Sequence, residues 1–491
     1  MALSINISDR SNSLSSSGSL RNKNEIKDFR PDIRLKDNAP KRKRSKKLIV
    51  LIALLLIAVI GLLSAQKLLD LSSEMGLKIS AGDFINPVIK DPQLKKDKNG
   101  NRTNILLVGL DTRETDHGLQ NTDTMIVGSY SHDDHTFTMF SIPRDTYLEQ
   151  PGNANWFVKS NGIYNQVESR EEGQGLNVLK KTIEDYVGFE IQYYGLVDIQ
   201  GFKNVIDILG GVEVYVENSF TDYAYPDESG TSTYKVVSFQ KGLQLMDGDT
   251  ATKYVRSRKS LDSGEGSDFA RARRQQQVIK AIHKKVLSTE TLLNPKKIIE
   301  LLAEVQGNIK LSEFTNEDIQ AAISIINKDA DLEIYSFVLD PNIGSRQILT
   351  EGVIPDAYSI GPTLGLGEYD DLHDIVQRIL KDPVFYTQDP TIFTYDIGAG
   401  FIAAAERSEE LSKKYPYTTI IYQGTLYTDK SSDYVYDNST DGTYGNSIKK
   451  IAQLLTKPIL TKPDFITNRL NGEDVVVLFG SGITEDQNEV E

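Results

Sequence analysis

Aspartate and arginine residues gather at the ends of predicted strands in this sequence. Asp111 and Arg113 directly follow a predicted strand at 104–110, and Asp123 comes just before the next predicted strand, 125–130. Both carboxylates are therefore expected at one edge of a sheet, which is where ligands bind in open α/β sheets. Carboxylates suit a hard divalent cation, and arginine suits phosphate oxygens.

More arginines follow along the chain. Arg144 comes after a third predicted strand, 137–142, and Arg256 and Arg258 are two residues apart. In an extended segment, residues at this spacing point to one face. The pair is then expected to grip one multiply charged oxyanion. Ordinary solvated strand residues are the alternative interpretation of this pair.

A long helix predicted over 269–287 adds further polar residues. Asp268 precedes this helix and is expected to be its N-cap. A stripe at i, i+4, i+7 and i+11 consists of Arg271, Gln275, Val278 and Ile282. An Arg and a Gln on an apolar stripe face inward, where an unpaired charge is costly. Together these residues are typical of a phosphate clamp with a divalent cation, although capping alone accounts for Asp268 and turn formation alone for Asp111 and Asp123.

The composition limits the chemistry. Cysteine is absent from all 491 residues, which excludes disulfides, a thiolate nucleophile and cysteine-built zinc sites. His132 and His135 flank two aspartates and could suggest a metal site, but a predicted hairpin turn at 131–135 explains the same residues. No phosphate-loop motif is present. The net charge of −14 argues against general nucleic-acid binding.

The charge is divided between the head of the chain and the rest. Residues 1–47 contain 13 Lys or Arg against 5 Asp or Glu, so they carry +8 and the remainder carries −22. Residues 48–65 follow without a charge, and as a helix they span about 27 Å, close to the bilayer core. Basic residues before this run place the N-terminus inside and the acidic remainder outside. A cleaved signal peptide is the alternative, although both segments are long for one.

The rest of the chain alternates predicted strands and helices, which indicates an α/β fold. Helices are predicted at 176–187, 202–209 and 248–254, and strands at 191–197, 212–216 and 332–339. A second α/β pattern begins near residue 390. The predicted organisation is a disordered basic cytoplasmic tail (1–47), a transmembrane helix (48–66), a stalk (67–102), a main domain (103–380), a smaller C-terminal α/β domain (388–484) and an acidic tail (485–491).

Six segments, in order across about 103–380, resemble the LytR-CpsA-Psr family of cell-wall glycopolymer transferases. They are NILLVGLDTR (104–113), NTDTM (121–125), SIPRDT (141–146), KSNG (159–162), YVRSR (254–258) and DFARARRQQ (268–276). Residues 390–488 resemble the small C-terminal domain that accompanies some members of the family.

The resemblance implies an α/β/α core with a mixed central sheet, which encloses a polyprenyl tail in a lipid tunnel with the pyrophosphate at its mouth. It also implies a phosphotransferase outside the membrane. A sugar hydroxyl of peptidoglycan would attack an undecaprenyl-pyrophosphate-linked polymer, such as capsule or teichoic acid, and displace polyprenyl phosphate. Two alternatives are a membrane-bound transcriptional regulator and a non-catalytic scaffold that presents the lipid-linked polymer.

The resemblance also implies roles for matching residues. Magnesium, or manganese in its place, would be held by Asp123 and Asp268, with Asp111 as a supporting carboxylate and the nearest candidate for a general base. The pyrophosphate would be clamped by Arg144, Arg256, Arg258 and Arg271. Further substrate-binding candidates are Arg113, Lys159 and Gln275.

Overall fold

The computed structural model describes residues 93–481, apart from 112–120, 151–155, 228–232, 263, 429, 467–473 and several positions within 293–331. The predicted cytoplasmic tail, apolar segment, acidic tail and most of the stalk lie outside the described residues, as does Arg113. Among the residues that are described, no helix is long and apolar enough to cross a membrane.

A mixed six-stranded sheet forms the centre of the main domain, as predicted. Its strands lie in the order β11, β6, β1, β2, β3, β12. They span Arg102–Leu110 (β1), Thr122–Ser131 (β2), Thr136–Ser141 (β3), Tyr193–Asp198 (β6), Ile309–Leu311 (β11) and Glu333–Val338 (β12). The β6–β1 and β3–β12 pairs are parallel, and the other three pairs are antiparallel.

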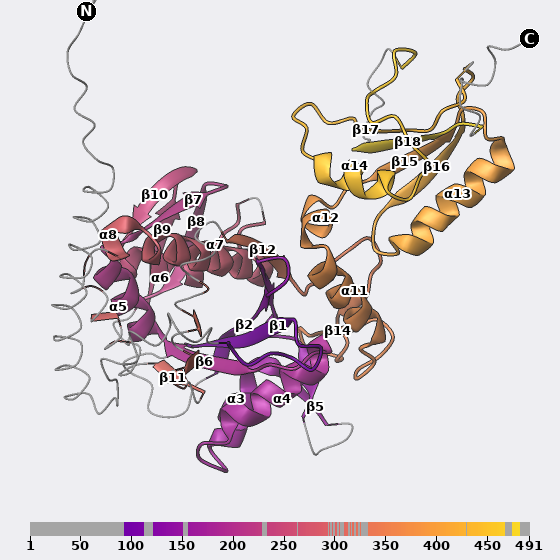
Figure 1. Cartoon of the computed structure of the whole chain (residues 1–491). Helices are drawn as coiled ribbons and strands as arrows, with labels where there is room; N and C mark the ends of the chain where they lie inside the picture. The colour runs from indigo at the N-terminus through magenta and orange to yellow at the C-terminus, as the bar shows by residue number, and fades with distance from the viewer. Residues whose placement is uncertain are drawn as a thin grey trace, which may run out of the picture. The chain divides into compact units, whose positions relative to one another are not determined.

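Helices cover both faces of this sheet (Figure 1). The first layer contains α3 (Ser160–Glu168), α4 (Gly175–Val187) and α11 (Asp370–Lys381), and the second contains α5 (Ile199–Leu209), α6 (Gly248–Arg256) and α7 (Asp268–Val286). Side chains alternate along each strand. Leu106 and Val108 therefore pack into the core with the first layer. Leu107 and Ile126 point the other way and line a cavity under the second layer.

A long bent hairpin completes the second layer. Its strands are β7 (Val212–Val216), β8 (Phe220–Pro226), β9 (Tyr234–Phe239) and β10 (Gly242–Met246). β7 pairs with β10, and β8 pairs with β9. Inner side chains such as Val214, Phe220 and Phe239 pack against Tyr254 of α6 and Val278 of α7. Only β7 was predicted from the sequence.

Short elements connect these layers. They are β4 (Tyr147–Glu149), β5 (Phe157–Lys159), α8 (Thr289–Leu292), β13 (Leu349–Glu351) and β14 (Ile360–Pro362). β4 pairs with β5, and β13 pairs with β14. β5 leads directly into α3, so the loop after β3 returns to the sheet edge and brings Lys159 and Asn161 close to Arg144.

The C-terminal part has a sheet and a core of its own. Its elements are α12 (Pro383–Gln388), β15 (Ile392–Asp396), α13 (Phe401–Lys414), β16 (Ile420–Thr425), β17 (Tyr434–Asp437), α14 (Gly445–Ala452) and β18 (Val475–Phe479). The strand order is β16, β15, β18, β17, and only β17 is antiparallel to its neighbour within this described sheet. Phe385 of α12 packs into this core.

Candidate active site

A cavity of about 430 Å³ lies between the sheet and the second helical layer. Its volume falls in the usual range for small-molecule sites. The apolar part of its wall includes Leu107, Ile126, Val197, Phe202, Val205, Ile279 and Ile282. Polar residues line it where β1 ends and β2 and α7 begin, namely Asp111, Asp123, Arg256, Arg258, Arg271 and Gln275. The cavity thus joins an apolar wall to a group of arginines and aspartates.

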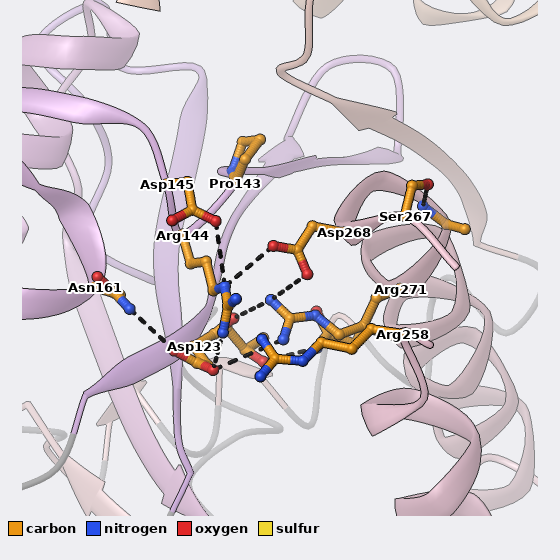
Figure 2. A network of polar contacts seen from close by, with 12 residues as sticks. Asp123, Pro143, Arg144, Asp145, Asn161, Arg258, Ser267, Asp268 and Arg271 are labelled. Carbon is orange, nitrogen blue, oxygen red and sulfur yellow. Dashed lines mark hydrogen bonds and ion pairs between the residues drawn. The ribbon is translucent and has the colours of Figure 1, made fainter. Parts of the chain in front are cut away.

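Asp123, at the start of β2, receives donors from three other parts of the chain (Figure 2). Asn161 Nδ2 donates to its Oδ1 at 3.1 Å, and Arg144 Nη1 donates to its Oδ2 at 2.7 Å. Arg271 Nη1 lies 3.7 Å from the same Oδ2. Burial would raise the pKa of Asp123, but Arg144 and Arg271 outweigh it and lower that pKa below its usual value. Asp123 is therefore an anion at neutral pH.

Arg144 lies among three carboxylates. Besides Asp123, its Nε contacts Asp268 Oδ2 at 3.0 Å and Asp145 Oδ2 at 3.3 Å. Burial would lower the pKa of Arg144, but Asp123 and Asp268 raise it above the ordinary value. Lys159 Nζ contacts the other oxygen of Asp145 at 2.5 Å. Among the described residues, Arg144 and Lys159 do not belong to the cavity lining. Arg144 instead holds Asp123, Asp145 and Asp268, and Lys159 holds Asp145.

The prediction that Asp268 caps α7 is wrong. Ser267 is the N-cap, with extended backbone angles, and its hydroxyl accepts the N–H of Ala270 at 3.1 Å. Serine and aspartate cap helices about equally well, so the sequence favoured neither position clearly. As the first helical residue, Asp268 directs its carboxylate to Arg144 and to Arg271, whose Nη2 lies 3.4 Å away. Burial would raise the pKa of Asp268, but these arginines lower it.

The expectation of an extended segment through Arg256 is also wrong. α6 continues two residues beyond its predicted end, and Arg256 is its last residue. Ser257 then turns the chain before Arg258. Both arginines nevertheless line the cavity. Arg256 Nη2 donates to Asp111 Oδ1 at 2.8 Å, and Figure 2 shows Arg258 beside Arg271.

The polar stripe predicted on α7 is present. Arg271, Gln275 and Ile282 line the cavity, and Val278 is buried. Burial lowers the pKa of Arg271, and Asp268 partly offsets this effect. Arg271 Nη2 donates to the carbonyl of Asp123 at 3.2 Å. Its buried Nε has no hydrogen-bond partner among the residues that the structure describes.

Three residues of the site were not among the candidate site residues given by the sequence. Asp145 connects Arg144 to Lys159, and Asn161 holds Asp123. Asp145 belongs to the SIPRDT segment and Asn161 to the KSNG segment. Their place in these segments was the sequence signal that could have identified them.

The third is Arg274, which has 2% of its surface exposed. It donates to the carbonyls of Tyr254, Ser257 and Glu265 and pairs with the Glu265 carboxylate at 2.7 Å. Arg274 therefore positions the segment that carries Arg256 and Arg258.

The two histidines of the β2–β3 turn form no metal site. His132 Nε2 lies 2.8 Å from the Thr103 hydroxyl, and His135 Nδ1 lies 3.1 Å from the Tyr130 hydroxyl. In the described part of the chain, no three His, Asp or Glu side chains are grouped to hold a metal ion. A cation at Asp123 would therefore need ligands from the substrate as well.

Known proteins resemble this chain over its main domain. The model of the LytR_cpsA_psr family matches residues 74–344. The polyisoprenyl-teichoic acid–peptidoglycan teichoic acid transferase TagV of Bacillus subtilis is 30% identical over 275 residues, which cover 55% of this chain and 66% of that protein. The transferase of the same description named TagU, from Oceanobacillus iheyensis, is 33% identical over 224 residues, covering 45% of this chain and 63% of that protein.

Solved structures also match. The crystal structure of B. subtilis TagV aligns with a TM-score of 0.42 at 23% identity, covering 59% of this chain and 99% of that one. The chain spans just under two thirds of the length of the two curated relatives described above.

Proposed function

This chain belongs to the LytR-CpsA-Psr family, and on that basis we propose that it transfers a glycopolymer from a polyprenyl-pyrophosphate carrier onto peptidoglycan. The relatives TagV and TagU are named as transferases of teichoic acid from a polyisoprenyl carrier to peptidoglycan. One observation carries the proposal for this chain. An apolar cavity ends in a group of arginines, as an isoprenoid pyrophosphate requires, and beside them lie Asp111 and Asp123, of which Asp123 is ionised.

The apolar wall is suited to the lipid part of the substrate. Aliphatic and aromatic side chains from the sheet, α5 and α7 surround the cavity. Each buried CH₂ group of an isoprenoid contributes about 0.8 kcal/mol of binding. The lipid would thus be held by burial of apolar surface, independently of any ion.

The polar residues are suited to the pyrophosphate. Arg256, Arg258 and Arg271 line the cavity, and Gln275 lies one helical turn beyond Arg271. The unpartnered Nε of Arg271 is a buried donor that a phosphate oxygen would satisfy. Arginine binds phosphate through paired N–H groups in a fixed geometry, which also orients the reacting phosphorus.

We propose that Asp123 also holds a magnesium ion, for which manganese could substitute. Its carboxylate is ionised and lines the cavity. Magnesium usually takes one or two protein carboxylates together with substrate phosphates and water. The second carboxylate would come from Asp268 or from Asp111. Of these two, Asp111 lines the cavity in the part of the chain that the structure describes, and Asp268 does not. Such an ion would neutralise charge on the pyrophosphate.

The reaction requires a hydroxyl of the acceptor sugar to attack the sugar-side phosphorus. The new P–O bond forms as the bond to the bridging oxygen breaks, so polyprenyl phosphate leaves and a phosphodiester remains. The hydroxyl proton must go to a base. Asp111 lines the cavity and is the candidate, held in place by Arg256. Positioning and charge neutralisation supply most of the catalysis in such transfers.

Replacing Arg256 or Arg258 with alanine is expected to lower transfer about tenfold to a hundredfold, because a charge-assisted contact to phosphate contributes about 1.5 to 3 kcal/mol. The measurement is release of polyprenyl phosphate from a lipid-linked donor in the presence of peptidoglycan. Arg273→Ala is the matched control, since Arg273 is exposed on α7. Wild-type rates in both test variants would remove these arginines from the site.

We also propose that the described residues lie outside the membrane, because the acceptor is the cell wall and the basic head precedes an apolar run. Protease added to intact, wall-stripped cells should digest the region after Lys67 and spare residues 1–47. Protection of the large region would contradict this topology.

A further inference from the structure

Exposed apolar side chains gather on the outer side of the β8–β9 hairpin and the loop beside it. Tyr223 is 57% exposed, Tyr234 68%, Val236 61% and Leu261 90%. We call these four residues the outer ledge. Tyr234 and Val236 share one face of β9, and Tyr223 lies in the bulge of β8 opposite them. Clustered exposed apolar residues of this kind usually mark an interaction surface.

The hairpin that carries the ledge is joined directly to the arginine clamp. The buried carboxylate of Asp222 accepts the backbone N–H groups of Arg258 at 2.9 Å and Lys259 at 3.2 Å. The ring of Tyr225 lies under the Arg256 guanidinium, 5.9 Å from its centre. Pro226, which pairs with Tyr234, lines the cavity itself. Asp222 and Tyr225 face inwards, and through the Pro226–Tyr234 pair the ledge reaches the edge of the cavity in which the pyrophosphate would lie.

The chemistry of the ledge fits a sugar chain. Tyrosine offers a flat apolar face with a polar hydroxyl, which matches the apolar face and hydroxyl rim of a pyranose ring. The hydroxyls of Thr221 and Ser238, 3.0 Å apart, lie on the same side of the hairpin. Asp262 accepts the N–H of Thr221 beside them. Lys235, Lys241 and Lys259 lie on the same hairpin and loop, so an anionic bilayer is the rival partner, although its headgroups would repel the carboxylate of Asp262.

We propose that the outer ledge binds the acceptor, a glycan strand of peptidoglycan, and holds its attacking hydroxyl near the clamp. This inference rests on the proposed transfer reaction. The donor is already held by its lipid tail and its pyrophosphate. The acceptor has neither group, so it needs a surface of its own next to the cavity.

The test measures steady-state transfer by a Tyr223→Ala/Tyr234→Ala double variant, with a lipid-pyrophosphate-linked disaccharide as donor and a soluble uncrosslinked peptidoglycan strand as acceptor. The KM for the acceptor is expected to rise about tenfold, as expected for two lost stacking contacts. The KM for the donor should not change. Tyr223→Phe/Tyr234→Phe, which keeps the rings, should retain most of the acceptor affinity.

Tyr215→Ala is the matched control, because Tyr215 is 55% exposed on the β7–β10 half of the same hairpin and belongs neither to the ledge nor to the described cavity lining. Equal acceptor KM values for the double variant, this control and the wild type would overturn the proposal. A changed donor KM alone would also overturn it, and so would loss of binding to phosphatidylglycerol vesicles with an unchanged acceptor KM. If the wild type releases no polyprenyl phosphate at all, the transfer reaction itself fails, which is a separate result.

Discussion

Asp123→Asn should abolish transfer, with a loss of about a thousandfold or more. Asparagine keeps the size of the side chain but removes the charge that faces Arg144 and Arg271. It also removes the principal carboxylate proposed to hold the metal ion. A metal ion supplies several kcal/mol of transition-state stabilisation, and each 1.36 kcal/mol is a factor of ten in rate.

The measurement follows polyprenyl phosphate release with and without EDTA, and after magnesium is restored. The variant should still bind the lipid donor, since the apolar wall does not involve Asp123. Asp111→Asn and Asp268→Asn, assayed in parallel, identify the second ligand as the one whose loss raises the magnesium requirement. Equal product with and without EDTA would refute the metal-assisted mechanism. A donor that binds but never reacts under any divalent cation would favour the scaffold function.

Arg144→Ala is expected to destabilise the domain by about 3 to 5 kcal/mol as well as to inactivate it. Removing one member of a buried charge network leaves its partners uncompensated. Here those partners are Asp123, Asp145 and Asp268, all of which have mostly buried side chains. Arg144→Lys keeps a charge but cannot contact all three carboxylates, so it should recover only part of the stability. Urea unfolding at pH 7 measures both variants.

The pH dependence of the free energy of unfolding tests whether lost charge pairing causes the destabilisation by Arg144→Ala. In the wild type the pKa values of Asp123 and Asp268 are lowered in the folded state. Their contribution to folding stability is therefore complete above the pKa of an unfolded aspartate, about 3.9, and is lost as pH falls through the pKa values of the folded state. Without Arg144, burial should raise these pKa values instead. The stability deficit of Arg144→Ala should then narrow as pH falls towards 4. A deficit of constant size would point to lost packing.

The strands around the site were predictable because their apolar residues are continuous or alternating and end in polar residues. β1, β2 and β3 lie within two or three residues of the predicted ranges. The placement of Asp111 and Asp123 at one sheet edge followed from the same pattern, and both line the cavity. The stripe on α7 was also readable, since helical spacing alone decides which residues share a face.

The start of α7, the end of α6 and the strands β8–β10 could not be predicted, because local sequence allows more than one structure at each of them. Ser267 and Asp268 are both good caps, and in the structure Ser267 caps α7 while the Asp268 carboxylate pairs with Arg144 and Arg271. Arg256 remains helical because Arg274 binds the last carbonyls of α6 from another helix. The β8–β10 strands were missed although Tyr234–Phe239 alternates exposed residues with partly or fully buried ones. Their exposed side is itself apolar, which obscures the inside–outside pattern.

The long-range character of the contacts around Asp123 has a consequence for how the protein acquires activity. Arg256 is 145 residues from Asp111, Arg144 is 124 residues from Asp268, and Arg271 is 148 residues from Asp123. Contacts of such separation form only after large loops have closed, so they belong to late steps of folding. A growing chain that has not reached α7 cannot assemble this site. The proposed activity would therefore arise only with the completed domain, and a partly folded chain would lack the clustered arginines and aspartates on which it depends.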